Sequence, residues 1–390
     1  MTRFRLLFAS YTLTLAALFL YSFTQVDLSL TFSKLSIWQT IEINFQQIGY
    51  FNRPLSTVIF LVILILLFIH YFAFIFLAIK KRISRKQAWF LVLAGFVILV
   101  FSYNAFSYDL FNYIFDAKIL THYNQNPYFY KALDFPNDPM LSFMRWTHRY
   151  YPYGPAWLFL TAPISFIGLN IFSLTFFLFK IFISGFFLGT VYLIEKIVRK
   201  VSPGNEIYAL VFFGLSPLVL IESVVSVHND IVMMFFAVLG LYFVLNKKFI
   251  LSIIAIIFSF FIKEVTILLL FPVLIFQNPI KKIFISSENF FRFCVLTMIA
   301  GFVYVLTKLE VQPWYFLWII PFIAFLKPNR YIFLLTSGIS LGLLLRYAPF
   351  LYQGDWNGVA IPIKFYVSII TPAIFLIAGL IWDVLRKIRA

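Results

Sequence analysis

The stretch LSTVIFLVILILLFIHYFAFIFLAI, residues 55–79, decides the fold class of the chain. It contains no Asp, Glu, Lys or Arg. A helix over these residues would be about 38 Å long at about 1.5 Å per residue, and the hydrocarbon core of a bilayer is about 30 Å thick. Backbone polar groups in lipid must bond within their own segment, so the stretch is predicted to be a transmembrane helix.

Similar apolar stretches follow one another along the whole chain. Of its 390 residues, 62% are hydrophobic and 12% are charged, whereas a soluble domain carries about twice that charge. The stretches lack the alternation expected of β-barrel strands. We therefore predict an all-α, polytopic membrane protein with about twelve transmembrane helices. The predicted spans are 5–22, 56–79, 87–105, 171–195, 206–223, 229–246, 249–263, 264–277, 289–307, 313–326, 330–346 and 362–386.

Basic residues are concentrated in short segments between these spans, as in cytoplasmic loops beside anionic headgroups. The net charge of +16 therefore indicates contact with membrane lipids, and nucleic-acid binding is not expected. Both termini are predicted inside the cell. This orientation leaves 11 of the 15 Asp and Glu residues outside. Acidic residues contribute little to orientation, so their accumulation there needs another explanation.

Two stretches are assigned by whether they must cross the membrane an even or an odd number of times. Residues 249–277 have basic flanks at both ends, so they are predicted to form a hairpin of short helices that turns outside at Lys263-Glu264. Residues 155–195 must cross an odd number of times, so 155–167 is predicted to be a partial or surface-lying helix. The N-terminal MTRFR and the apolar stretch after it resemble a signal sequence without a convincing cleavage site, which predicts an uncleaved first helix.

The longest outside segment, residues 104–154, is rich in Tyr, Asn, Asp and Pro. Long loops over an apolar bundle are more often functional than mere connectors. Helical spacing places four polar side chains of this segment on one face. They are Asp109, Asn112, Tyr113 and Asp116.

Four further polar clusters are predicted at the same membrane face, and this convergence indicates a site. They are His228-Asn229-Asp230, Lys263-Glu264, Gln312-Pro313-Trp314-Tyr315, and Arg346 with Asp355-Trp356-Asn357. Simpler interpretations remain open for each. The acids can cap helices, Lys263-Glu264 can be a solvated turn, the aromatic residues can form an interfacial belt, and Arg346 can reach headgroups.

Cofactor motifs are not found in the sequence. Cys294 is the one cysteine, so neither a disulfide within the chain nor a Cys-based metal site can form. His148 and His228 are weak signals alone, because no HxxxH or other cluster has the spacing of metal ligands. Neither GxGxxG nor a Walker A motif offers a nucleotide site. No metal or other cofactor is therefore expected.

The order of the outer-face motifs resembles that of the GT-C superfamily of membrane glycosyltransferases, and most of all its prokaryotic polyprenol-phosphate-mannose-dependent mannosyltransferases. The likeness covers roughly residues 87–346. Its motifs are "NYIFDAKIL…NPY", "YPYGPAWLFL", "HND", "KEVT" and "QPWYFLWIIPF". The family usually has "YPP" where this chain has Tyr151-Pro152-Tyr153, and "HPWY" where it has Gln312-Pro313-Trp314-Tyr315. The resemblance implies two regions, an N-terminal transmembrane hairpin at 1–86 and a catalytic transmembrane domain at 87–390.

The resemblance further implies inverting transfer of a hexose, with mannose expected, from a polyprenyl-phosphate donor to a lipid-linked or glycan acceptor. The reaction would take place on the non-cytoplasmic side of a prokaryotic cell membrane. Asp109 is the expected base, with a pKa raised by burial, and Asp116 is the second candidate. Lys263 and Arg149 are expected to share a phosphate cavity, with Arg346 at its rim. The other expected substrate contacts are Asn112, Tyr113, His148, Tyr151, His228, Asn229, Asp230, Glu264, Gln312, Trp314 and Tyr315. Competing hypotheses are a transporter or flippase of lipid-linked saccharides and a non-catalytic scaffold.

Overall fold

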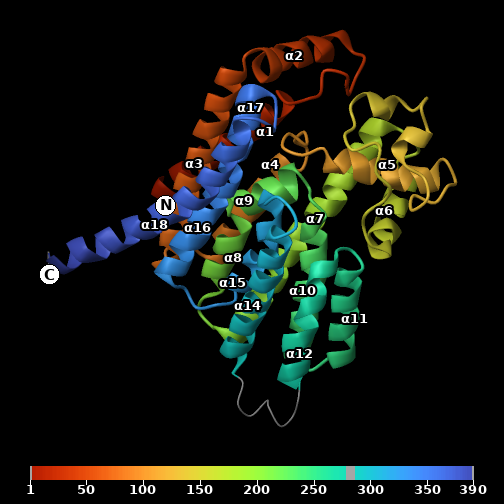
Figure 1. The fold of residues 1–390 in the computed structure, drawn as a ribbon. Helices are drawn as coiled ribbons and strands as arrows, with labels where there is room; N and C mark the ends of the chain where they lie inside the picture. Colours follow the sequence, from red (N-terminus) through yellow and green to blue (C-terminus); the bar gives the residue numbers. More distant parts are fainter. Residues whose placement is uncertain (1, 278–285, 389–390) are drawn as a thin grey trace.

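The computed structural model describes residues 2–277 and 286–388, and in this part of the chain the regular structure is entirely helical. Long helices pack side by side in a bundle, and α5 and α6 form a separate lobe at one side (Figure 1). Among the described residues, six segments are long and apolar enough to cross a membrane. They comprise α1 (Thr2–Phe23), α3 (Arg53–Ile79), α7 (Phe172–Val201), α14 (Ser287–Leu306), α16 (Arg330–Leu345) continued by α17 (Tyr347–Gln353), and α18 (Ala360–Ile388).

Shorter helices fill the rest of the bundle and the side lobe. They are α2 (Ser36–Gln46), η1 (Gln47–Phe51), α4 (Arg85–Leu99), α5 (Asp109–Thr121), η2 (Ala132–Asp134), η3 (Pro139–Ser142), α6 (Pro155–Ile167), α8 (Glu206–Gly214), α9 (Pro217–Leu220), η4 (Ile221–Val225), α10 (Asp230–Leu245), α11 (Phe249–Phe260), η5 (Glu264–Leu269), α12 (Leu270–Gln277), η6 (Pro313–Trp318) and α15 (Ile320–Ile323).

The prediction of about twelve spans is not confirmed. In the described residues six segments qualify by length and composition, or seven if the pair Glu206–Gly214 and Pro217–Val225, bent by 54°, counts as one. Helices such as α10 and α11 have 16 and 12 residues, and at about 1.5 Å per residue they are shorter than a hydrocarbon core of about 30 Å. Apolar sequence revealed the helices, but it did not reveal where each helix ends.

The two stretches assigned by parity have the expected local form. Residues 249–277 divide into α11 and the pair η5–α12, and the break lies at 261–263, next to the expected turn. Residues 155–167 form the 13-residue helix α6, which packs against α5. The side of the membrane on which these turns lie stays a prediction.

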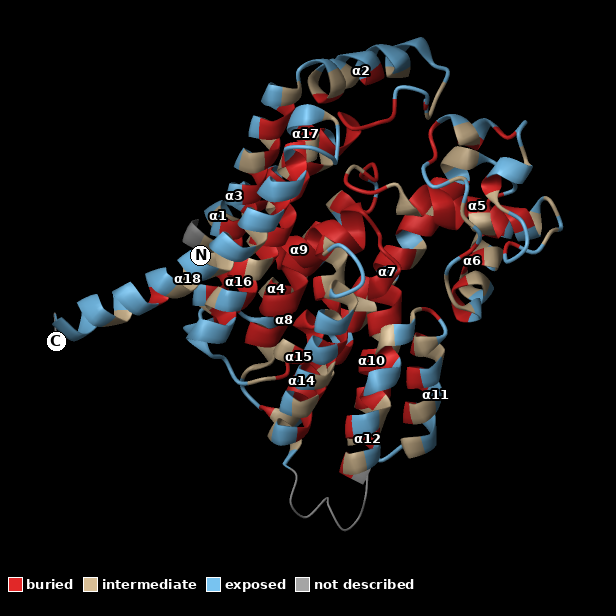
Figure 2. Cartoon of the chain, in the orientation of Figure 1, coloured by how far each residue is buried: buried red, intermediate tan, exposed pale blue. Residues whose placement is uncertain are grey.

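The buried core runs through the middle of the bundle, along α7, α8, α9 and α10 (Figure 2). Helix α3 packs against α8 and α17, so the N-terminal helices adjoin the rest of the bundle. The division at residue 86 remains a prediction. By contrast, α18 packs on α16 and α17 along one face only, most of its other residues are exposed, and its C-terminal end projects from the bundle (Figure 1). Its apolar outer face is that of a helix surrounded by lipid.

Candidate active site

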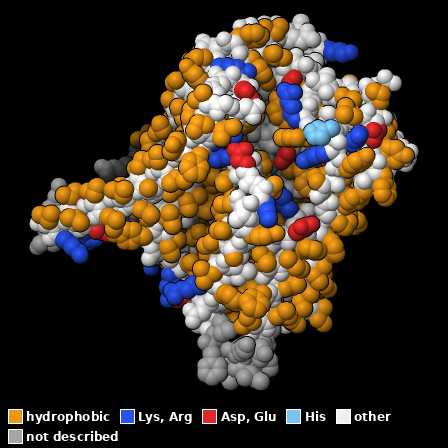
Figure 3. Space-filling view, in the orientation of Figure 1, with side chains coloured by type: hydrophobic (Ala, Val, Ile, Leu, Met, Phe, Trp, Pro, Cys, Tyr) orange, Lys and Arg blue, Asp and Glu red, His pale blue; other side chains and the backbone are white. Residues whose placement is uncertain are grey.

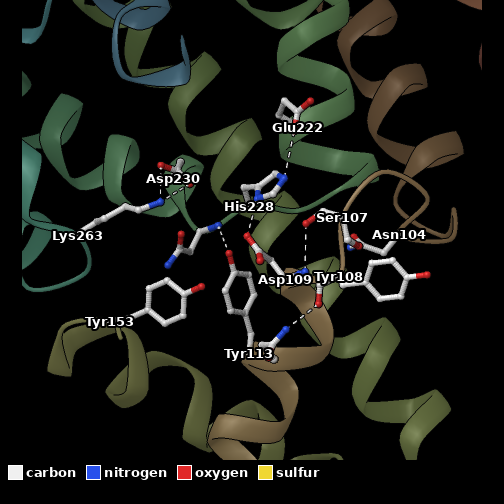
Figure 4. Close-up of polar contacts among 12 residues, drawn as sticks. Asn104, Ser107, Tyr108, Asp109, Tyr113, Tyr153, Glu222, His228, Asp230 and Lys263 are labelled. Atoms are coloured by element: carbon white, nitrogen blue, oxygen red, sulfur yellow. Dashed lines mark hydrogen bonds and ion pairs between the residues drawn. The ribbon is translucent and has the colours of Figure 1, made fainter. Parts of the chain in front are cut away.

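Asp109 is the first residue of α5, and local hydrogen bonds fix its position (Figure 4). The Ser107 hydroxyl accepts a hydrogen bond of 3.1 Å from the backbone N–H of Asp109, and Asn104 binds the Ser107 carbonyl oxygen. The N-cap residue of α5 is Tyr108, whose side chain makes no capping hydrogen bond, and the Asp109 carboxylate is not a cap either. The carboxylate points instead to His228, so helix capping does not explain this residue.

The segment that carries His228 begins with a sharp bend in the bundle. After Leu215 and Ser216 the chain turns by 54°, and Ile221–Val225 form a π-helical turn. Val227 follows with a φ of 44°. A β-branched residue in this left-handed region is strained, and such strain concentrates at functional sites.

A buried lysine holds this bend from the side of α7. Lys180 has no exposed surface, and its ammonium group donates to the carbonyl oxygens of Val224 and Val225 at 2.7 and 2.6 Å. It also donates to the Ser102 hydroxyl at 3.2 Å. A cation is stabilised at a helix C-terminus because the free carbonyls there carry partial negative charge. Lys180 thus anchors the turn that leads to His228.

His228 lies between two carboxylates. Its Nδ1 is 3.3 Å from Asp109 Oδ2, and its Nε2 is 3.2 Å from Glu222 Oε2. Tyr347 donates a hydrogen bond of 3.0 Å to Glu222 Oε1. Burial opposes the charged form of His228, but Asp109 and Glu222 favour it and raise the pKa of His228 to about 9. The imidazole is therefore protonated at neutral pH. Asp109, His228 and Glu222 form a row of ion-paired side chains, which we call the relay.

The two aspartates of α5 have different protonation behaviour. Burial would raise the pKa of Asp109, but His228, Arg149 and Lys263 outweigh it and hold that pKa below its usual value. The expected upward shift is therefore wrong, because cations surround the carboxylate. Burial raises the pKa of Asp116 to about 7, although Arg149 opposes the shift. At neutral pH Asp109 is ionised and Asp116 is partly protonated.

Asp230 is paired rather than free. Both of its carboxylate oxygens accept hydrogen bonds of 2.9 Å from the Lys263 ammonium group, and Trp318 Nε1 donates to Oδ1 at 2.5 Å. Lys263 also lies over the rings of Tyr315 and Trp318, at 5.6 and 5.9 Å. Asp230 is therefore no helix cap, and Lys263 is more than a solvated turn residue.

Aromatic side chains surround this polar centre. The Trp314 ring stacks on the His228 ring with centroids 3.9 Å apart, which places Trp314 inside the site and not in an interfacial belt. Tyr113 accepts a hydrogen bond of 3.4 Å from the backbone N–H of Asn229 and packs against Tyr153. The side-chain amide of Asn229 is buried, and neither its oxygen nor its nitrogen has a hydrogen-bond partner among the described residues. Unsatisfied buried polar atoms are costly, and they are expected where a substrate binds.

A cavity of about 180 Å³ adjoins the relay. Trp314 and Tyr347, which contact His228 and Glu222, form part of its wall together with Gln312 and Arg346. Arg346 is buried and bonded within the protein, so it does not reach for headgroups. Lys263 and Arg149 do not line this cavity, although both influence the pKa of Asp109. In the described residues the cations that line the cavity are therefore Arg346, which was expected only at the rim, and Lys364.

The remaining expected residues lie in several places. Asn112 is buried and donates to the Tyr108 carbonyl oxygen at 3.2 Å, and Tyr151 is buried against Tyr153. Arg149 donates to the Tyr153 hydroxyl at 3.3 Å. The side chains of His148 and Glu264 are exposed.

Sequence reasoning missed Glu222, Tyr347, Trp318 and Lys364. Glu222 had a usable signal, because it is an ionisable residue within the apolar stretch 217–225. Tyr347 and Trp318 are aromatic residues in a chain that is 21% aromatic, so composition could not mark them. In residues 2–277 and 286–388 no group of three His, Cys, Asp or Glu is arranged to hold a metal ion.

Comparison with known proteins gives one match. The family model described as "Alpha-(1->6)-mannopyranosyltransferase, N-terminal domain" matches residues 8–278, which is more than half of the chain. The matched range includes Asp109, Glu222, His228 and Lys263, whereas Arg346 lies beyond it. No curated protein and no solved structure matches.

Proposed function

This chain belongs to the alpha-(1->6)-mannopyranosyltransferase family, and we propose that it moves mannose from a polyprenyl-phosphate donor to a lipid-linked or glycan acceptor. The family and the apolar helices together identify a membrane glycosyltransferase. One observation carries the finer proposal. An ionised carboxylate, Asp109, is held by a buried histidine beside an aromatic cavity that contains Arg346.

In the proposed reaction the acceptor hydroxyl attacks the anomeric carbon of mannose from the face opposite the phosphate. A new carbon–oxygen bond forms as the bond from the anomeric carbon to the phosphate oxygen breaks. The electron pair leaves with polyprenyl phosphate, and the hydroxyl proton passes to the Asp109 carboxylate. The configuration at the anomeric carbon inverts. The family description supports a mannose 6-hydroxyl as the acceptor group.

His228 and Glu222 position the base in this scheme. Protonated His228 fixes the Asp109 carboxylate, and Glu222 fixes His228 from its other nitrogen. When Asp109 takes up the acceptor proton it loses its negative charge. Glu222 then remains as a partner for the imidazolium, so the buried cation is not left alone.

Asp116 is the competing base. Its pKa of about 7 suits proton transfer near neutral pH, since a base works best when its pKa is close to the operating pH. We favour Asp109 because it is ionised before substrate arrives and adjoins the wall of the cavity through His228 and Trp314. Asp116 has no comparable link to the cavity among the described contacts.

A test of the function uses purified protein in detergent with polyprenyl-phosphate mannose and extracted acceptor lipids. Mass spectrometry is expected to show acceptors heavier by one hexose and the release of polyprenyl phosphate. A transporter or flippase would bind the donor without consuming it, so unchanged donor and acceptor would favour that competing function. Parallel reactions with other polyprenyl-phosphate hexoses identify the sugar.

The proposed outer location of segment 104–154 can be tested by cysteine labelling. Asn137 is exposed, and the native Cys294 is buried, so the background labelling is expected to be low. In Asn137→Cys cells, an impermeant maleimide added from outside is expected to react. Labelling that requires permeabilised cells would reverse the topology and place the reaction on the cytoplasmic side.

A further inference from the structure

Two buried cations in the cavity share a single carboxylate. Arg346 Nη2 and Lys364 Nζ lie 2.6 and 2.8 Å from the same oxygen of Glu310. The cation side chains are 7% and 6% exposed, whereas that of Glu310 is 54% exposed. Arg346 is fixed further by the Lys364 carbonyl oxygen at 3.0 Å and the Ser368 hydroxyl at 3.2 Å. Arg346 is thus held by contacts other than Glu310. Lys364 lies over the Trp356 ring at 5.4 Å, and the Glu310 carboxylate is the solvated partner.

The charges of this cluster are unbalanced. Two positive groups face one carboxylate, which leaves a net charge of about +1 in a cavity lined by aromatic rings. A buried charge is costly unless it is paired. Replacing the carboxylate with a phosphate monoester, which carries a charge of −1.5 to −2 at about neutral pH, would bring the cluster close to neutrality. A phosphate also offers three oxygens, enough to bind the arginine fork and the ammonium group together.

We propose that Arg346 and Lys364 form a binding site for the phosphate of polyprenyl phosphate, and that Glu310 occupies this site when the phosphate is absent. The inference rests on the proposed function and adds the residues that receive the leaving group. During transfer the phosphate gains negative charge as its bond to mannose breaks, so the pair binds the product phosphate more tightly than the donor phosphodiester. Glu310 then competes with the product and promotes its release.

The surroundings of the cluster favour a lipid phosphate over a free one. The cavity wall includes Trp314, Tyr347, Phe350 and Trp356, which provide apolar surface next to the cations. Lys364 lies on α18, whose neighbouring residues Ile361 and Phe365 are exposed on its outer face. A prenyl chain can therefore leave the cavity along a lipid-facing helix. Figure 3 shows charged side chains gathered around a hollow in the middle of this face, between broad hydrophobic surfaces.

The test measures binding of polyprenyl monophosphate to the full-length protein by native mass spectrometry, and product release by kinetics. Glu310→Gln is expected to tighten binding about tenfold, in line with about 1.4 kcal/mol for one lost charged competitor. It should also slow multiple-turnover transfer while single-turnover transfer stays normal. Lys364→Met should weaken binding about tenfold. Arg346→Lys, which retains the charge but loses the fork, covers the case in which Lys364→Met does not fold.

Glu288→Gln is the matched control, because Glu288 also bridges two cations, Arg292 and Lys327, at 2.6 and 2.8 Å. It does not line the cavity, so it should leave binding unchanged. Phosphatidic acid and inorganic phosphate distinguish the sources of the phosphate group. Equal affinity for phosphatidic acid, or no tightening in Glu310→Gln, would overturn the proposal. If the variants change polyprenyl monophosphate binding as expected but the wild type transfers no sugar, the proposed function is refuted and the phosphate site is still supported.

Discussion

Two buried carboxylates of this protein, Glu195 and Glu222, differ in how fully their oxygens are hydrogen-bonded. Glu195 in α7 accepts hydrogen bonds from Arg85, Arg199 and Trp89, at distances of 2.5 to 3.1 Å. Both of its oxygens are used. In the relay, by contrast, Glu222 Oε2 and both nitrogens of His228 lack hydrogen bonds of good geometry, although they lie close enough to form ion pairs.

We interpret this difference as the difference between a structural ion cluster and a reactive one. A satisfied buried cluster contributes to stability and to the choice of one packing. A cluster with unused donors and acceptors costs stability, and it persists where those groups are needed for a substrate. The predictions below test this contrast, beginning with the largest expected effect.

Asp109→Asn is expected to reduce transfer by at least about 10²–10⁴-fold, because the amide cannot accept the acceptor proton. Its expression, detergent stability and donor binding should persist. Glu195→Gln is the matched change in the satisfied cluster. It should lower the melting temperature and leave turnover per folded molecule unchanged. Initial rates and thermal melts of the two variants check the contrast, and a fully active Asp109→Asn enzyme would contradict it.

Lys263→Ala tests a residue that lies between the two classes. Its ammonium group is tied to Asp230, as Arg85 is tied to Glu195, but it also lowers the pKa of Asp109. Lys263 does not line the cavity, so we expect its loss to act through Asp109 and to lower kcat/KM; a loss of about 2–4 kcal/mol of transition-state stabilisation would indicate direct contact with the donor phosphate. The measurement is kcat/KM at limiting donor. A normal value with a lower melting temperature would make Lys263 a structural residue.

The relay should make stability depend on pH. The folded-state pKa of His228, about 9, lies above the usual value of about 6.5. Its contribution to stability is therefore fully present below about pH 6.5 and is lost as the pH rises through about 9. The melting temperatures of the wild type and His228→Gln should converge with rising pH. His122→Gln is the control, and a constant difference for both variants would count against a charged His228.

Asp116→Asn is expected to have the smallest effect and to leave substantial activity. The pH dependence of kcat/KM gives a second measure. If Asp109 is the base, the rate should be flat between about pH 6 and 8, because its pKa lies below the usual range. If Asp116 is the base, the rate should rise through about pH 7, where that group loses its proton. A dead Asp116→Asn enzyme with an active Asp109→Asn enzyme would reverse the assignment.

The sequence predicted much of this molecule because membrane helices have a strong compositional signal. It predicted the helical fold, the break near Lys263 and the helical spacing around Asp109, which begins α5. It could not predict the end of α4 at Leu99, six residues short of the expected boundary at 105, because Val100 and Phe101 continue the apolar stretch beyond that end. The length of an apolar stretch therefore did not predict the length of its helix, and the number of membrane-spanning helices was overestimated.

The partners in the site were beyond sequence reasoning for a different reason. Asp109 and His228 are 119 positions apart, and Glu222 and Tyr347 are 125 apart. Their contacts depend on the bend at Leu215–Ser216 and on the packing of α17 against α3. Glu310 and Lys364 also come together only through helix packing. Spacing within one helix, which gave the face of Asp109 and Asp116, carries no information on such pairs.

Val227 has a consequence for anyone who sets out to make this enzyme more heat-resistant. Its φ of 44° costs about 1–2 kcal/mol for a β-branched residue, and glycine would adopt the same angle freely. A screen for thermostable variants would therefore favour Val227→Gly if relief of the angle outweighs the loss of a buried side chain. The same change would loosen the segment that aims His228 at Asp109. Gains in heat resistance at this position should thus be accompanied by losses in turnover, which makes Val227 a poor choice for stabilisation.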